Sequence, residues 1–416
     1  MTVMETQGLA AKHAARRLAA ASTEEKNRAL AAVADALLRR RDEWLAANAA
    51  DLEAARAAGM RPALLDRLAL DEGRVAGIAE GVRQVAALPD PIGQVVKIIR
   101  RPNGLKIEQR RVPLGVAGII YEARPNVTVD AAVLCLKAGN AVLLRGGKEA
   151  FRSNKAVVAI LRDALETSGL PRDCVALVED TSRQSAQEMM DLTGYLDVLI
   201  PRGGPGLIRS VAANAHVPVI RTGEGVCHVY VHQDADLDMA ARILYNAKCS
   251  RPSVCNAAEC VLIDRAVAED FLPMAWEYLK NKNVVLHGGP EARDILGDVV
   301  VPATEEDWDT EYGDYQLAVK VVSGFDEAVD FIAAHSTGHS EAIVTENYTV
   351  AQRFLDAVDA AAVYVNASTR FTDGFEFGLG AEIGISTQKM HARGPMGLEE
   401  LTSTKYVIYG SGQVRE

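Results

Sequence analysis

The chain has 416 residues, of which 49% are hydrophobic and 24% charged, and its formal net charge is −11 at pH 7. Roughly two to three domains are expected at this length. Because no apolar run approaches the ~20 residues of a membrane helix, we expect a soluble protein. The acidic balance argues against a general nucleic-acid or membrane-surface role, since such binding depends on basic patches.

The N-terminus and the cysteines indicate the compartment. Residues 1–20 include several charges and no continuous apolar segment, so they do not resemble a secretory signal. The six cysteines show no CxxC or zinc-like pairing, and a chain of this size needs no disulfides. We therefore expect a cytoplasmic protein with reduced cysteines and no metal. His335 and His339 have i,i+4 spacing, but no carboxylate or thiol completes a ligand set.

The first hundred residues predict a helical layer and then a hairpin. Residues 5–88 are rich in Ala and Leu at helical spacing, and Ser22-Thr23-Glu24-Glu25 fits a capping box. Residues 89–91, Pro-Asp-Pro, end this layer. Residues 95–111 predict two strands around Pro102-Asn103-Gly104, and a hairpin so rich in Lys and Arg should protrude.

Strands alternate with helices from residue 114 to residue 215. The expected strands are 116–120, 141–144, 175–178 and 198–200, and the expected helices are about 127–138, 153–167 and 183–192, with Gly139 and Gly169 after the first two helices. This order predicts a doubly wound parallel sheet, which binds ligands at the carboxyl ends of its strands.

Two glycine-rich turns follow strands of this predicted sheet. They are Arg145-Gly146-Gly147-Lys148 and residues 201–206, which include Gly203 and Gly204. Neither matches GxGxxG or P-loop spacing, so each alone could be a plain turn. Two such turns at strand ends of one sheet favour a dinucleotide site. The second turn opens a helix at Leu207, whose amides could hold a phosphate.

The second half predicts another α/β domain. A β-pair is expected over residues 217–231, then an α/β stretch from 237 to about 365, a glycine-rich coil over 374–397 and a last strand over 405–409. Cys255 lies early in this stretch, in a polar turn just before the apolar strand 260–263. A thiol there is presented to solvent, and Arg251 would favour the nucleophilic thiolate. The alternative is a packed small hydrophobe.

Asn126 and Cys227 are two further candidates for a role in the site. Asn126 follows a predicted strand end, so it either caps the next helix, expected to begin near Val127, or points its amide at an oxyanion. Cys227 precedes His228 in a predicted strand, where neighbours face opposite sides, so the two cannot form a catalytic pair. We therefore expect Cys227 to be structural.

Together these segments resemble the aldehyde dehydrogenase superfamily, and within it the branch that reduces γ-glutamyl phosphate. The likeness covers nearly the whole chain. The segments that carry it are residues 112–116, 121–126, 139–150, 200–204, 227–231, 251–256, 339–343 and 391–395.

The resemblance implies roles for individual residues. It makes Cys255 the nucleophile, makes Asn126 and the Cys255 amide the oxyanion donors, and places Glu311 on the nicotinamide ribose. Arg145 falls at the adenosine ribose. Lys148 replaces a glutamate common in NAD-preferring members, which favours NADP(H) because a cation attracts the 2′-phosphate.

By the resemblance, Thr222 falls at the position of the hydrolytic general base, and Glu224, two residues away, takes that position if the register shifts slightly. Without that base a thioester would survive for hydride attack. Arg124 and Arg251 are candidates for the substrate phosphate, and either could instead be a structural ion pair.

The resemblance implies NADPH-dependent reduction of L-glutamate 5-phosphate to the 5-semialdehyde and phosphate, the second step of proline biosynthesis. The alternatives are a coenzyme A-acylating dehydrogenase and a non-enzymatic NADP-binding redox sensor. Expected partners are the small-molecule substrate, the upstream glutamate 5-kinase and further copies of the chain.

The resemblance also implies a domain plan with a Rossmann-type cofactor domain and an α/β catalytic domain. The cofactor domain would span 1–94 and 112–235, and the catalytic domain 236–365. Residues 95–111 and 403–416 would form an oligomerisation hairpin and strand, and 366–402 would return to the cofactor domain.

Overall fold

The structure, a computed structural model, describes residues 1–415, apart from the side chains of residues 62 and 63. It contains two compact units. Unit 1 comprises Met1–Thr222, Gly378–Gly384 and Met396–Glu416, and unit 2 comprises Gly223–Phe377 and Ile385–Pro395. Among the described residues, no helix has both the length and the apolar character to cross a membrane.

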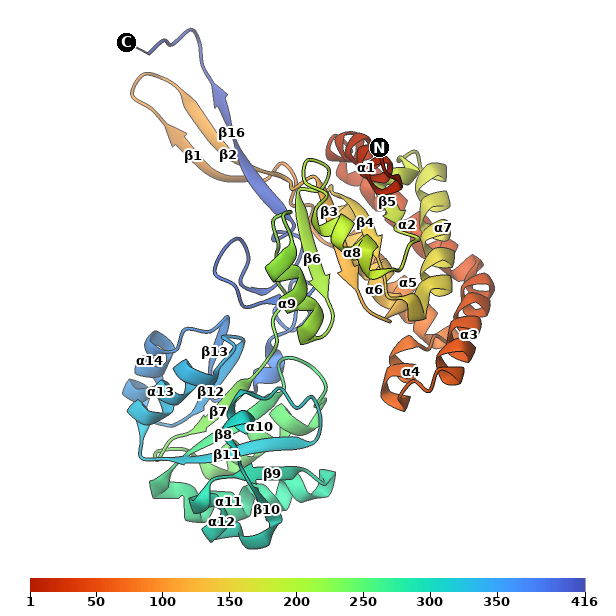
Figure 1. Ribbon diagram of the computed structural model, residues 1–416. Helices are drawn as coiled ribbons and strands as arrows, with labels where there is room; N and C mark the ends of the chain where they lie inside the picture. Colours follow the sequence, from red (N-terminus) through yellow and green to blue (C-terminus); the bar gives the residue numbers. More distant parts are fainter. Residues whose placement is uncertain (416) are drawn as a thin grey trace. The chain divides into compact units, whose positions relative to one another are not determined.

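Unit 1 begins with the expected helical layer (Figure 1). Its helices are α1 (Val3–Ala19), α2 (Thr23–Arg39), α3 (Arg41–Ala57), α4 (Pro62–Leu68) and α5 (Glu72–Ala87). The capping box before α2 is confirmed, because the Ser22 hydroxyl accepts from the Glu25 amide while the Glu25 carboxylate accepts from the Ser22 amide.

A four-stranded parallel sheet forms the core of unit 1, in the order β5-β4-β3-β6. Its strands are β3 (Val116–Tyr121), β4 (Ala141–Arg145), β5 (Val175–Leu177) and β6 (Val198–Arg202), and its helices are α6 (Pro125–Lys137), α7 (Phe151–Thr167), α8 (Arg183–Met190) and α9 (Pro205–Asn214), with single 3-10 turns η1 (Lys148–Ala150) and η2 (Arg172–Cys174). Each expected strand and helix is present, with ends shifted by at most two residues. Gly139 and Gly169 have the positive φ values, 79° and 87°, expected after α6 and α7.

The strand order gives this sheet a topological switch point. The chain passes from β3 to β4 and β5 on one side, and then crosses to β6 on the other side of β3. The loops after β3 and β6 therefore diverge, and ligands of doubly wound sheets bind in such a crevice.

A separate three-stranded antiparallel sheet completes unit 1. It joins β1 (Val95–Arg100), β2 (Lys106–Pro113) and β16 (Thr402–Tyr409), and Figure 1 shows these strands side by side, extending away from the helices of the unit. The hairpin and the last strand are confirmed. Apolar side chains on β1 and β16 face solvent, with Ile98 51%, Tyr406 62% and Ile408 58% exposed.

Unit 2 is built on a seven-stranded parallel sheet in the order β10-β9-β11-β8-β7-β12-β13. Its strands are β7 (Cys227–Val231), β8 (Ala258–Asp264), β9 (Val285–Gly288), β10 (Val300–Pro302), β11 (Gln316–Val322), β12 (Ser340–Val344) and β13 (Ala362–Val365). Its helices are α10 (Leu237–Cys249), α11 (Arg265–Leu279), α12 (Pro290–Leu296), α13 (Phe325–His335) and α14 (Tyr348–Ala357), with 3-10 turns η3 (Lys280–Lys282), η4 (Gly297–Val299), η5 (Glu305–Asp309) and η6 (Thr369–Phe371). The short strands β14 (Ile385–Ser386) and β15 (Gly394–Pro395) pair with each other.

Alternating residues of the central strands pack against helices on both faces of this sheet. Val229 and Val261 join the apolar cluster that contains α10 and α11, whereas Tyr230 joins the cluster that contains Phe331 of α13 and Phe354 of α14. Burial on both faces explains why these strands are apolar at nearly every position.

Two expectations about the region joining the units differ from the structure. The predicted β-pair over 217–231 is wrong, because only β7 is a strand, and it lies parallel between β8 and β12. Residues 217–220 are apolar but form only the isolated bridge between Leu199 and Val219. Since β7 joins the sheet of unit 2, the units divide after Thr222 rather than at 235, and the return segment 366–402 is shared between them.

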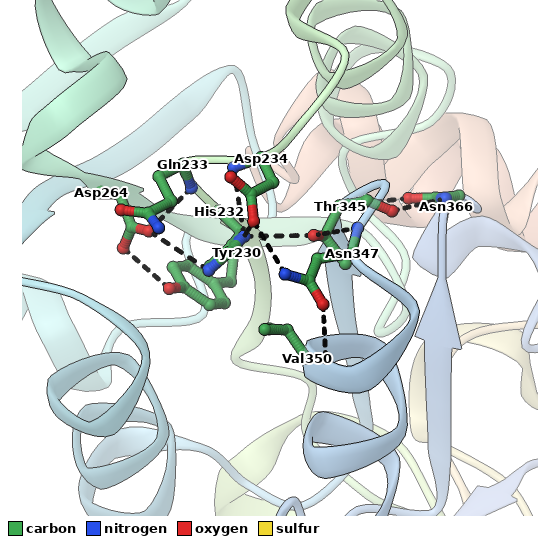
Figure 2. Close-up of polar contacts among 9 residues, drawn as sticks. All are labelled: Tyr230, His232, Gln233, Asp234, Asp264, Thr345, Asn347, Val350 and Asn366. Atoms are coloured by element: carbon green, nitrogen blue, oxygen red, sulfur yellow. Dashed lines mark hydrogen bonds and ion pairs between the residues drawn. The ribbon is translucent and has the colours of Figure 1, made fainter.

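The carboxyl ends of β7, β8 and β12 meet in a polar network (Figure 2). The Tyr230 hydroxyl donates to Asp264 at 2.7 Å, and His232 Nδ1 lies 3.1 Å from the Thr345 hydroxyl. Asn347 Nδ2 donates to Asp234 at 2.9 Å, which links the loops after β12 and β7. In this sheet the chain passes from β7 to β8 on one side and later to β12 on the other side of β7, so β7 and β12 form its switch point. The polar side chains at this switch point satisfy one another.

Candidate functional site

Cys255 lies at the opposite, amino end of β8, in a turn between α10 and that strand. The Ala257 amide donates to the Val254 carbonyl at 3.0 Å and closes the turn. Cys255 is half-buried, whereas the other five cysteines are buried. Of the six thiols, Cys255 is thus the one presented for chemistry, because a thiol that reagents and substrates reach must be partly exposed.

Asn256 fixes the far side of this turn. Its side-chain Nδ2 donates to the carbonyls of Thr372 at 2.9 Å and Arg370 at 3.3 Å, and its own carbonyl accepts from the Thr369 hydroxyl at 2.7 Å. Asn256 is only 3% exposed. These bonds tie the residue after Cys255 to η6, which is more than a hundred residues away in sequence.

The carbonyl of Cys255 is held from the near side. A Cβ atom on Gly225 would lie 1.4 Å from this carbonyl oxygen, so only glycine allows the approach. The Cys227 thiol donates to the same oxygen at 3.2 Å. Burial raises the pKa of Cys227 well above its usual range, which keeps the thiol protonated and able to donate. Cys227 is buried, as a structural role requires, and it contacts the turn of Cys255 directly.

His339 lies behind Cys227. Its Nδ1 is 3.8 Å from the Cys227 sulfur and 2.8 Å from the Ser340 hydroxyl, and its Nε2 is buried without a hydrogen-bond partner among the described residues. Burial lowers the pKa of His339 to about 4, so the ring is neutral at pH 7. His335 ends α13 and contacts Asp309 instead, so the i,i+4 spacing does not bring the two rings together on one helix.

A buried ion pair orders the loop that carries Glu311. Lys248 Nζ lies 2.5 Å from Glu259, both side chains are nearly inaccessible, and the Glu259 carboxylate also accepts from the Gly313 amide at 3.2 Å. Burial raises the pKa of Glu259 to about 7 and lowers that of Lys248, while their mutual attraction opposes both shifts. Glu311 itself accepts from the Gly225 amide at 3.2 Å. Neither residue is among the candidates predicted from the sequence, although a lysine and a glutamate inside otherwise apolar elements are a usable signal.

Of the two sequence candidates for a general base, Thr222 is engaged as a hydrogen-bond donor and Glu224 lies near a second carboxylate, that of Glu311. The Thr222 hydroxyl donates to the Pro201 carbonyl at 2.9 Å, so it is engaged as a donor. Burial raises the pKa of Glu311, and the neighbouring charge of Glu224 adds to that shift. The charge of Glu224 therefore disfavours ionisation of Glu311.

In unit 1, α6 begins at Pro125, with Arg124 in the cap position, so the interpretation of Asn126 as a helix cap is wrong. The Asn126 Nδ2 atom donates to the Asp130 carboxylate at 3.1 Å. Burial raises the pKa of Asp130 to about 6, so it is largely ionised at pH 7 and can only accept. Asp130 thereby fixes which way the Asn126 amide points and leaves its second N–H for another acceptor.

The glycine-rich turns of unit 1 offer a cation and backbone amides. Lys148 is exposed and makes no hydrogen bond or ion pair with any described residue. Arg145 donates to the carbonyls of Thr181 at 2.8 Å and Ser182 at 2.7 Å, which anchors its head at the strand ends. Gly204 precedes α9 without a side-chain cap, and a Cβ on Gly203 would come within 2.6 Å of Glu122. These features fit a nucleotide phosphate, because uncapped amides at a helix N-terminus attract anions.

The model of the aldehyde dehydrogenase family matches residues 7–295. The chain is 58% identical over 410 residues to the gamma-glutamyl phosphate reductase of Halothermothrix orenii, with 99% of this chain and 98% of that protein covered. It is 60% identical over 405 residues to the enzyme of that name from Carboxydothermus hydrogenoformans, with 97% of each covered.

Solved structures give the same picture. The gamma-glutamyl phosphate reductase of Thermotoga maritima superposes with a TM-score of 0.97 at 50% identity, over 99% of both chains. An acetylating aldehyde dehydrogenase from Geobacillus thermoglucosidasius superposes with a TM-score of 0.69 at 17% identity, covering 99% of this chain and 97% of that one, which shows a common fold.

Gly225→Ala should slow alkylation of Cys255 by iodoacetamide and lower kcat at least about tenfold, because the new methyl group must displace the Cys255 carbonyl. The matched control is Gly77→Ala in α5, where a Cβ meets nothing within 4 Å and helix propensity should improve. If Gly225→Ala is alkylated and turns over at the wild-type rates, the close contact between Gly225 and the Cys255 carbonyl does not position this turn.

His339 should make unfolding depend on pH below neutrality. Its pKa is about 4 in the folded chain and 6.5 as the ordinary value, so the unfolded chain alone binds a proton between these limits. The free energy of unfolding should therefore fall by about 1 kcal/mol per pH unit below pH 6.5. Urea denaturation at pH 7.5, 6.5 and 5.5 measures this slope. His339→Gln should flatten this slope, so equal slopes in wild type and His339→Gln would refute the assignment.

Proposed function

Because the chain belongs to the aldehyde dehydrogenase family, we propose that it reduces L-glutamate 5-phosphate with NADPH to glutamate 5-semialdehyde and phosphate, the second step of proline biosynthesis. The observation that carries this proposal is the presented thiol of Cys255 on a turn fixed from both sides, in a chain nearly 60% identical to reductases of that name.

The reaction begins on Cys255. Its thiolate attacks the acyl phosphate carbonyl, and the Asn126 amide with the Cys255 backbone amide stabilises the tetrahedral oxyanion, each donor contributing about 3 kcal/mol. Phosphate leaves as the tetrahedral adduct collapses, and a thioester remains on Cys255. In this mechanism Asp130 orients the Asn126 amide and Gly225 with Cys227 holds the backbone of the nucleophile.

When bound, the nicotinamide cofactor supplies the hydride that reduces the thioester carbonyl to the aldehyde level. Lys148 would hold the 2′-phosphate, Arg145 the adenosine ribose, the amides after Gly203 and Gly204 the pyrophosphate, and Glu311 the nicotinamide ribose. Collapse of the second tetrahedral adduct returns the thiolate to Cys255. With Thr222 engaged as a donor to Pro201, water near the thioester lacks a base at that position.

The exposed sheet β1-β2-β16 suggests that the chain works as a homo-oligomer. Ile98, Tyr406 and Ile408 present apolar surface on strands with an open edge, and such edges pair readily with another strand. A labile acyl phosphate also favours direct hand-over from the upstream kinase.

The proposed activity is tested by following NADPH formation from glutamate 5-semialdehyde in the presence and absence of phosphate. Wild type should turn over only with phosphate, and Cys255→Ala should lose on the order of 10⁴-fold or more in kcat while keeping its affinity for NADPH. Cys174→Ala, which alters a buried thiol of unit 1, is the matched control and should keep its kcat. Turnover without phosphate, or an active Cys255→Ala, would exclude this mechanism.

Lys148→Glu should shift the ratio of kcat/KM for NADPH over NADH toward NADH by at least about tenfold, since a carboxylate repels the 2′-phosphate and accepts from a 2′-hydroxyl. Lys280→Glu, at an exposed lysine of unit 2, controls for the change in net charge. An unchanged ratio would move the 2′-phosphate site to another residue.

Removing residues 403–416 should give a smaller species by light scattering, because β16 and its exposed apolar side chains are lost. The double variant Tyr406→Glu with Ile408→Glu should give the same result while keeping the strand. If both variants retain the mass of the wild type, association uses a different surface.

A further inference from the structure

Arg370 in η6 places its guanidinium against the turn that carries Cys255. Its Nε donates to the Ser250 hydroxyl at 3.1 Å, and its Nη1 donates to the Asn256 side-chain oxygen. These two acceptors stand at either end of residues 251–255. The Ser250 hydroxyl in turn donates to the Asn246 carbonyl at 2.7 Å, so the anchor for the Arg370 head is itself fixed to α10.

Arg251 is a second cation near the Arg370 guanidinium, and its hydrogen-bond donors are unused within the described residues. Arg251 is exposed and has no hydrogen-bond or ion-pair partner among the described residues, and the Nη2 atom of Arg370 has none among them either. Burial lowers the pKa of Arg370, and the charge of Arg251 lowers it further. The positive charges of Arg251 and Arg370 repel each other. An anion bound by both guanidinium groups would remove that repulsion.

The loop that continues from Arg370 also carries carboxylates. The charges of Asp373 and Glu376 raise the pKa of Arg370, opposite to the effect of Arg251. Asp373 Oδ1 accepts from the amides of Phe375 at 2.9 Å and Glu376 at 3.4 Å, which leaves its second oxygen for another donor. Cations with a carboxylate nearby match a zwitterion better than a phosphate, because a phosphate dianion would be repelled by Asp373 and Glu376.

We propose that Arg251 and Arg370 bind the α-carboxylate of the substrate and that Asp373 receives its α-ammonium group. This inference rests on the proposed function. A glutamyl group has two methylene groups between its reacting carbonyl and its α-carbon, so its amino-acid end must be recognised near Cys255. Specificity for that end follows from Arg251 and Arg370, and the phosphate is bound by other groups.

The test uses the full chain in the oxidative direction, with NADP and phosphate, and compares two aldehydes. Glutamate 5-semialdehyde carries the α-carboxylate, and 4-aminobutanal is the same molecule without it. The variants are Arg370→Gln, which keeps an amide donor for Ser250 or Asn256, Arg370→Lys, which keeps the charge, and Arg251→Gln, at an exposed residue whose loss should not impair folding. Arg353→Gln on α14 is the control for loss of an arginine that is paired elsewhere, with Asp326.

Arg370→Gln and Arg251→Gln should each lower kcat/KM for glutamate 5-semialdehyde at least about tenfold, with little change for 4-aminobutanal or in KM for phosphate. Arg370→Lys should lose less than Arg370→Gln, and Arg353→Gln should lose nothing. Equal losses with both aldehydes would show that Arg370 only supports the turn through Asn256. A raised KM for phosphate alone would assign the arginines to the phosphate, and either result overturns the proposal. A wild type inactive on the semialdehyde would instead refute the proposed function.

Discussion

The carbonyl oxygen of Cys255 is the point on which the geometry of the reactive turn depends. Gly225 packs against it so closely that no side chain fits, and the protonated thiol of Cys227 donates to it. On the other side Asn256 is tied to η6. In the proposed mechanism, a nucleophile whose backbone is fixed from two directions keeps its position as the substrate arrives, which lowers the entropic part of the barrier.

A buried ion pair helps to hold the same segment in place. The pair of Lys248 and Glu259 contributes little net stability by itself, because desolvation offsets most of the attraction, but removing one partner would leave an uncompensated charge at a cost of about 3–5 kcal/mol. Its effect is to position the backbone, since the Glu259 carboxylate accepts from the Gly313 amide while Glu311 accepts from the Gly225 amide. The segment that supports Cys255 and the loop that carries Glu311 are therefore ordered together.

The local sequence pattern predicted most of the fold, but it predicted few of the contacts that hold the turn of Cys255. The strands of unit 1 follow from apolar runs between amphipathic helices, and the glycines after α6 and α7 follow from their positive φ. The start of α6 was misplaced because proline is well tolerated at the first helical position, which moved Asn126 from the cap into the helix. The contact between Arg370 and Asn256 joins residues 114 positions apart and leaves no trace in either local sequence.

The two parallel sheets differ in whether the polar groups at the carboxyl ends of their strands have partners within the chain. In unit 2, at the switch point between β7 and β12, His232, Thr345, Asn347 and Asp234 satisfy one another, and Cys255, the proposed nucleophile, lies at the amino end of β8. In unit 1 the loops after β4 and β6 instead leave Lys148 unpaired among the described residues and α9 without a side-chain cap. A strand-end crevice can bind a ligand only when some of its polar groups lack partners within the chain, so unpaired groups, rather than strand order alone, indicate where a ligand could bind.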